Sequence, residues 1–134
     1  MAAALQPIFG KLRAILKRNA PSFRVSEDSP DHYALDATPG PATLRAWGGK
    51  VKRPRIPVAW VEIRKTYVSY HLMGVAHPSV RETLSKQLEA RLQGKTCFNF
   101  RTNDDALFRE LDQVTHLGLS TFREAGFVTD RESA

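Results

Sequence analysis

The sequence predicts an α+β fold, in which an antiparallel sheet of about five strands is covered by an N-terminal, a middle and a C-terminal helix. Within residues 56–73 two adjacent runs are rich in β-branched and aromatic residues, and only Arg64 and Lys65 separate them. This arrangement is typical of a β-hairpin. Three other segments carry apolar residues at three- and four-residue steps, which is typical of amphipathic helices. A chain of 134 residues is long enough for one domain with one core, and we expect an ordered core over about 7–127.

Before the hairpin we expect one helix and three short strands. The helix spans 7–20, because Pro7 suits a first turn and Pro21 stops the apolar stripe. Polar and acidic residues at 26–31 predict a loop, and the TPGP motif at 38–41 predicts a firm break. The strand candidates are 22–25, 32–37 and 43–47.

The second strand of the hairpin has two distinct faces, because side chains alternate along a strand. Val68, Tyr70 and Leu72 share the apolar face and are expected in the core. The other face carries hydroxyls and an imidazole, from Tyr67, Ser69 and His71. This polar face is the first candidate for a ligand-binding surface.

After the hairpin the sequence predicts a helix, a strand and a last helix. The middle helix begins at His77-Pro78-Ser79 and ends at Gly94, with an apolar stripe along Val80, Leu84, Leu88 and Leu92. The strand covers 96–101 and includes Cys97. A weak capping box at 102–105 begins the last helix, which ends at Gly126 and contains Gly118 as a kink or a close packing contact.

Basic residues are concentrated between Arg45 and Lys65. This segment has seven basic residues against one acidic residue, Glu62, and so matches the whole net charge of +6. A local positive field attracts nucleic acid, anionic small molecules or acidic proteins. Four aromatic residues, Trp47, Trp60, Tyr67 and Tyr70, are interleaved with these cations, an arrangement suited to stacking bases and holding phosphates.

No cofactor or metal site is predicted. Gly94-Lys95-Thr96 lacks the first glycine of a P-loop and the strand–loop–helix order. The histidines and the single cysteine show no metal-ligand spacing. Ser69 and His71 share a strand face roughly 6–7 Å apart, too far for direct activation of the hydroxyl. No residue is therefore assigned a catalytic role. An enzyme that uses His71 and Cys97 is kept as an alternative function.

Several segments resemble the DUF1801, or YdhG-like, family. They are Ala20-Pro21 after the first helix, KTYVSYHLM at 65–73, GKTCFNF at 94–100 and LFRELDQVTHLGLSTFREAGF at 107–127. The resemblance implies that 1–134 is a single α+β domain with helices on an antiparallel sheet. Some members carry a frataxin-like iron-chaperone label, which makes iron handling a second alternative. That role would require an oxygen-rich, acidic surface.

The sequence thus favours a non-catalytic binding module with a basic, aromatic surface. We expect an anionic small molecule, an acidic protein or nucleic acid as its partner, and self-association into a homodimer through an edge strand is a further expectation. No membrane span or signal peptide is expected, and one cysteine fits a reducing cytoplasm. The predicted ligand-binding residues are Tyr67, Ser69, His71, Trp47, Arg53, Arg55, Arg64 and Lys65.

Overall fold

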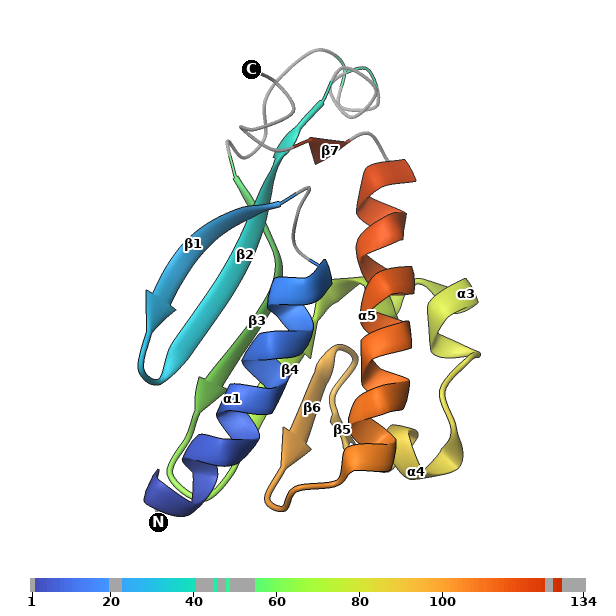
Figure 1. The fold of residues 1–134 in the computed structure, drawn as a ribbon. Coiled ribbons are helices and arrows are strands. Elements are labelled where there is room, and N and C mark those ends of the chain that lie inside the picture. The colour runs from blue at the N-terminus through green and yellow to red at the C-terminus, as the bar shows by residue number, and fades with distance from the viewer. Residues whose placement is uncertain are drawn as a thin grey trace.

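The computed structural model describes residues 2–19, 23–40, 45, 48, 55–124 and 127–128. Helices and strands alternate irregularly along the chain (Figure 1). In order, the elements are α1 (Ala2–Asn19), β1 (Arg24–Ser29), β2 (His32–Pro39), β3 (Ile56–Ile63), β4 (Val68–Leu72), the 3-10 helix η1 (Met73–Ala76), α3 (Pro78–Arg81), α4 (Lys86–Glu89), β5 (Leu92–Gln93), β6 (Cys97–Phe100), α5 (Asp105–Glu124) and β7 (Phe127–Val128).

The strands form one antiparallel sheet. Six of the described strands follow the order β1-β2-β3-β4-β6-β5, and β7 pairs with the end of β2. The predicted α+β class is therefore confirmed. The sequence did not predict β5 and β7, because each has only two residues, too few for an alternating pattern to be visible.

The central hairpin is also confirmed. β3 and β4 pair antiparallel, with Trp60 opposite His71 and Val61 opposite Tyr70. The connection is longer than two residues, since the Arg64 N–H donates to the Tyr67 carbonyl over 2.7 Å. Val68, Tyr70 and Leu72 are fully buried, as their alternation predicts.

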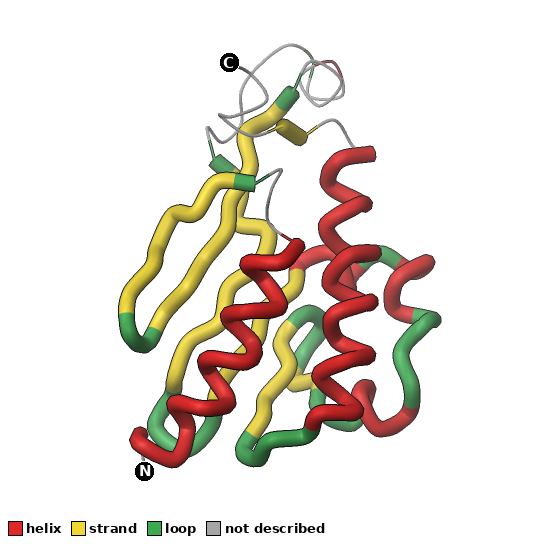
Figure 2. Tube along the Cα trace, in the orientation of Figure 1, coloured by secondary structure: helices red, strands yellow, loops and turns green. Residues whose placement is uncertain are grey.

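Two long helices cover one face of the sheet. α1 and α5 lie side by side in front of the strands (Figure 2). α1 begins five residues earlier than predicted, at Ala2, because Leu5 is buried in the core and the alanines before it have the highest helix propensity. The residues of these helices that are buried against the sheet include Ile8, Phe9, Leu12, Ile15, Leu16, Leu107, Phe108, Leu111, Val114 and Leu119.

The prediction of one continuous middle helix is wrong. The structure has two four-residue helices there, α3 and α4, followed by strand β5. Ser85 begins α4, because its hydroxyl accepts from the Leu88 N–H over 3.1 Å. Glu110 of α5 in turn accepts from the Ser85 N–H and hydroxyl, at 2.8 and 2.6 Å. Gly94 lies in the β5–β6 turn with a φ of 84°, rather than after a helix.

Three smaller expectations change. The acidic residues predicted as a loop extend β1 to Ser29, because backbone pairing with β2 continues to the Ser29–His32 pair. Such an edge strand tolerates exposed charges. α5 is capped by Asp104, whose carboxylate accepts from the Leu107 N–H over 3.2 Å, and not by Thr102. The strand expected at 43–47 lies outside the described residues, apart from Arg45.

Candidate functional site: the outer face of the sheet

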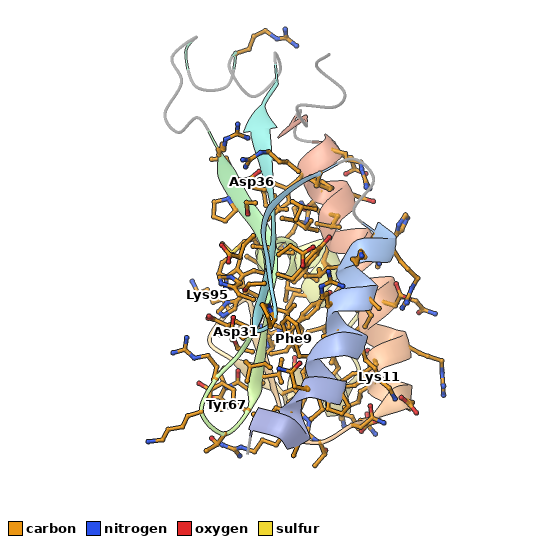
Figure 3. All side chains as sticks on the ribbon, turned by 60° about the vertical axis from the view of Figure 1, so that its left-hand side comes forward. Phe9, Lys11, Asp31, Asp36, Tyr67 and Lys95 are labelled. Carbon is orange, nitrogen blue, oxygen red and sulfur yellow. The ribbon has the colours of Figure 1, made fainter. Side chains whose placement is uncertain are left out.

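The side of the sheet away from α1 and α5 carries polar and aromatic side chains. In Figure 3 Tyr67 and Lys95 lie on this side, whereas Phe9 lies between α1 and the sheet. Alternation and the pairing register decide which residues belong to it. We define the outer face by two rows of cross-strand neighbours on β2, β3, β4 and β6, which are His32, Glu62, Ser69 and Asn99 in one row and Ala34, Trp60, His71 and Cys97 in the other.

A continuous chain of contacts runs through the centre of the outer face. The rings of Trp60 and His71 are stacked, with centroids 4.4 Å apart and planes 13° from parallel. The Cys97 Sγ lies 3.4 Å from the His71 Nε2 and 3.4 Å from the Asn99 Oδ1. Cys97 and His71 are 26 residues apart in the chain, and only the β4–β6 register brings them together.

The protonation states of this chain of contacts are set mainly by burial. Burial lowers the pKa of His71, although the Glu62 carboxylate partly opposes the shift. Burial raises the pKa of the Cys97 thiol, and Glu62 adds to that shift. Both groups are therefore neutral near pH 7, so the pair is a thiol beside an imidazole and not a thiolate beside an imidazolium. A cysteine nucleophile requires the thiolate.

Ser69 lies on the outer face but is almost fully covered. Ser69 is buried, and its hydroxyl oxygen has no hydrogen-bond partner among the described residues. Its cross-strand neighbours are Glu62 and Asn99. Ser69 thus forms part of the floor of the outer face, where an incoming ligand has little access to it.

A hollow of about 310 Å³ lies over β2, beside the Trp60 ring. We call it the Ala34 slot, because the small side chain of Ala34 leaves the space opposite Trp60. Asp36 lines it and is only 7% exposed. The Asp36 Oδ2 accepts from Arg24 over 3.1 Å, whereas the Oδ1 has no hydrogen-bond partner among the described residues. Among the described residues, the lining is Ser26, His32, Ala34, Leu35, Asp36, Arg55, Pro57 and Trp60.

A second hollow of about 310 Å³ lies at the other end of the outer face, on the β5–β6 hairpin. We call it the arginine pocket, and its lining is Ala90, Arg91, Gln93, Asn99 and Arg101. Within the described ranges neither Arg91 nor Arg101 makes an ion pair, and both are exposed. The Arg101 guanidinium lies 6.0 Å from the centre of the Tyr67 ring, within the range of a cation–π contact.

A hollow on the opposite side of the molecule is a weaker candidate. It has about 290 Å³ and lies between α1 and α5, where Figure 3 shows Lys11. Its charges already pair with each other: Lys11 with Asp105 at 2.7 Å and Arg18 with Asp112 at 2.8 Å. The Lys11 hydrogen bond lowers the pKa of Asp105. A ligand there would have to displace these bonds.

The structure brings together only some of the predicted site residues. Tyr67, Ser69 and His71 lie along β4 as expected, and Arg64 and Lys65 occupy the adjacent turn. Arg64 is paired with Glu62 at 3.0 Å. Arg55 lies apart from them, at the Ala34 slot, 3.9 Å from the Asp36 Oδ1. Trp47 and Arg53 lie outside the described residues.

The aromatic surface and the set of site residues also need corrections. Tyr70, counted among the surface aromatics, is fully buried, and its hydroxyl bonds the Thr115 hydroxyl at 2.5 Å. Conversely, Asp36, Arg91 and Arg101 were not predicted as site residues. The alternation of β2 and of the β5–β6 hairpin would have placed them on the outer face, but their strand partners come only from the tertiary structure.

In the described part of the chain, no group of three or more His, Cys, Asp or Glu side chains is arranged to hold a metal ion. No helix formed by the described residues is long and apolar enough to cross a membrane. Comparison of the chain with family models, curated proteins and solved structures found no match.

Proposed function

We propose that the protein is a non-catalytic binding module whose outer face binds an anionic ligand. The observation that carries this proposal is the arginine pocket, which lies on the same sheet face as the Trp60–His71 stack. Two guanidinium groups, Arg91 and Arg101, have no carboxylate partner within the described ranges. Arginine presents several donors in a planar fork that matches carboxylate and phosphate oxygens.

The other charges of the outer face add to this attraction. The Glu62 carboxylate is paired with Arg64, and the Asp36 carboxylate with Arg24. Lys65 is exposed in the β3–β4 turn, and Lys95 is exposed in the turn of the β5–β6 hairpin that carries the arginine pocket. The β4–β6 half of the face is therefore electropositive, and its field would raise the local concentration of a negatively charged ligand.

The two alternatives receive less support from the geometry. An enzyme using His71 and Cys97 needs a thiolate, but burial raises the pKa of Cys97 and lowers that of His71. An iron chaperone needs several carboxylate oxygens in one place, because hard cations prefer such ligands. Two described carboxylates of the outer face, Asp36 and Glu62, each pair with an arginine, and a third, Glu27, lies exposed on β1 opposite Ala34. Among the described residues these carboxylates do not form a group of three ligating side chains that could hold a metal ion.

Binding can be measured by fluorescence anisotropy against a single-stranded oligonucleotide, a panel of nucleotides and an acidic peptide. Removing two cations, in the double variant Arg91→Ala with Arg101→Ala, should weaken binding about tenfold and reduce its salt dependence. The matched control removes two exposed cations from the helix side, Lys17 and Arg109. That control should bind like the unmodified protein.

Two results would count against the proposal. One is the absence of salt-sensitive binding to all three kinds of anion at low ionic strength. The other is an equal loss of affinity in the two double variants, because this would mean that only net charge matters and not the arginine pocket.

We further propose that the protein works in the cytoplasm, where its single cysteine stays reduced. Homodimerisation is proposed through β1, the edge strand that carries the exposed Val25. Sedimentation analysis of Val25→Lys beside the unmodified chain tests it, and a monomer in both cases rules it out. Membership of the DUF1801, or YdhG-like, family stays a prediction.

A further inference from the structure

The Ala34 slot has one aromatic wall that is free to stack. His71 covers one side of the Trp60 ring, with the planes 13° from parallel. The cross-strand neighbour on the other side is Ala34, and Trp60 and Ala34 both line the slot. A flat ring inserted there would continue the stack of His71 and Trp60. Aromatic rings in such offset stacks attract each other beyond the area that they bury.

The slot also holds one polar group that needs a donor. The Asp36 residue is only 7% exposed, and its Oδ1 accepts no hydrogen bond from the described residues. The charge of Asp36 is balanced, because Arg24 bonds the Oδ2 and the Arg55 guanidinium lies 3.9 Å from the Oδ1. What is missing at the Oδ1 is an N–H or O–H donor at hydrogen-bond distance. Leaving a buried acceptor unsatisfied costs about 1–3 kcal/mol. The Oδ1 atom itself is covered, so a ligand that donates there gains this affinity only if the atoms covering the Oδ1 move aside as it enters.

We infer that the Ala34 slot binds a nucleobase with an exocyclic amino group, stacked on Trp60 and donating an N–H to the Asp36 Oδ1. This inference rests on the proposed function, which supplies the phosphate-binding cations on the same face. A base combines the two properties that the slot selects, a flat π surface and an N–H donor at its edge. An aliphatic anion has no ring for Trp60, and a purely apolar ring has no donor for Asp36.

The spacing of the two hollows favours a single strand over a free nucleotide. The slot lies over β2 and the arginine pocket lies on β6 and β5, with β3 and β4 between them. Three interstrand spacings amount to about 14 Å. That distance corresponds to roughly four nucleotide rises of about 3.4 Å along the axis of a stacked strand. An oligonucleotide of about four residues would therefore place a base in the slot and a phosphate in the arginine pocket together.

The ligand series that tests the inference uses the unmodified binding surface. The chain has two tryptophans, Trp47 and Trp60, and stacking of a base on Trp60 should quench part of the tryptophan fluorescence. Oligoadenylates of one to six residues should gain affinity steeply up to about four residues. Replacing adenine with N6,N6-dimethyladenine removes both amino hydrogens, and this should weaken binding about tenfold while the phosphates stay the same.

A second series of measurements uses protein variants, one of which fills the slot with a larger side chain. Ala34→Leu puts a larger side chain against Trp60 and should reduce affinity for oligoadenylate to that for an abasic strand of equal length. Ala106→Leu is the matched control, because Ala106 is exposed on α5, on the helix side. Circular dichroism checks that both variants fold. If Ala34→Leu does not fold, the dimethyladenine series decides the question on the unmodified slot.

The outcomes separate this inference from the proposed function. If Ala34→Leu and dimethyladenine leave affinity unchanged while loss of Arg91 and Arg101 weakens it, the slot does not bind a base, and the anion-binding function stands. If no anion binds in a salt-sensitive manner, both are overturned. A mononucleotide that binds as tightly as the tetranucleotide, and loses affinity in Ala34→Leu, supports the base slot with a free nucleotide as its ligand.

Discussion

Replacing Gly74 with alanine should destabilise the protein strongly, although the new side chain is only one methyl group. Gly74 lies in η1, directly after β4, where this segment crosses α5 at Gly118. A Cβ on Gly74 would be 2.5 Å from the Gly118 Cα, whereas ordinary van der Waals contact begins at 3.4 Å. The obstacle is backbone, so neither side can move without separating η1 from α5. Gly74 has no positive φ, and the penalty is therefore steric.

The expected loss of stability follows from this contact, which is about 1 Å shorter than van der Waals contact allows. Forcing an extra carbon into a packed contact costs about 3 kcal/mol at the upper end of the usual range. For a chain of this length each kcal/mol lowers Tm by about 3–4 °C, so Gly74→Ala should lower Tm by about 10 °C. Gly118→Ala should be milder, because its Cβ would meet the movable Leu72 side chain at 3.2 Å.

Gly10→Ala is the matched control for this series. Gly10 lies in α1 and is exposed, and a Cβ there would meet nothing within 4 Å. Alanine should stabilise that helix by about 1 kcal/mol. Thermal unfolding followed by circular dichroism would rank the four proteins as Gly10→Ala, unmodified, Gly118→Ala and Gly74→Ala, from most to least stable. A Gly74→Ala protein as stable as the unmodified one would refute the steric argument.

Three further predictions concern buried polar groups. Tyr70→Phe should cost about 1–2 kcal/mol, because it leaves the Thr115 hydroxyl without its partner; adding Thr115→Val should restore part of the loss in urea unfolding, and a further equal loss would contradict this. Burial lowers the pKa of folded His71, so the unfolded chain binds protons more readily and stability should fall as pH drops below about 6.5. His71→Gln should reduce this dependence of the unfolding free energy on pH, measured by denaturant titrations at pH 5 to 8. An unchanged dependence would mean that a group other than His71 causes it. Because burial raises the pKa of Cys97, iodoacetamide should react with it more slowly in the folded than in the urea-unfolded chain at pH 8; equal rates would reopen the nucleophile alternative.

Local patterns predicted the parts of the fold whose pattern is long and regular. The alternation around Trp60 and Tyr70 predicted the β3–β4 hairpin and its two faces, because burial on one face imposes a period of two. The stripes of α1 and α5 predicted both long helices in the same way. These elements extend over five to twenty residues, so their period can be read without knowing their partners.

The sequence did not predict the short elements, because contacts in the folded chain determine where they begin and end. The apolar residues Val80, Leu84, Leu88 and Leu92 fit a helical stripe, yet they fall in two short helices and a strand. Glu110 holds Ser85 at the start of α4, and Leu92 pairs opposite Phe98. Glu110 is 25 residues from Ser85 and accepts two hydrogen bonds from it. Phe98 is six residues from Leu92 and belongs to the same hairpin. These contacts divide a stripe that would otherwise fit one helix.

By itself, the sequence determined that an antiparallel sheet would carry helices on one side and a polar, aromatic face on the other. Side-chain period and apolar spacing are local properties, and they survive into the folded chain. Only the tertiary structure decided which side chains of that outer face meet. The strand order places His71 between Trp60 and Cys97, and it brings Trp60, Ala34 and Asp36 around one hollow. Strand order and register depend on pairing between segments far apart in the chain, which no local pattern specifies.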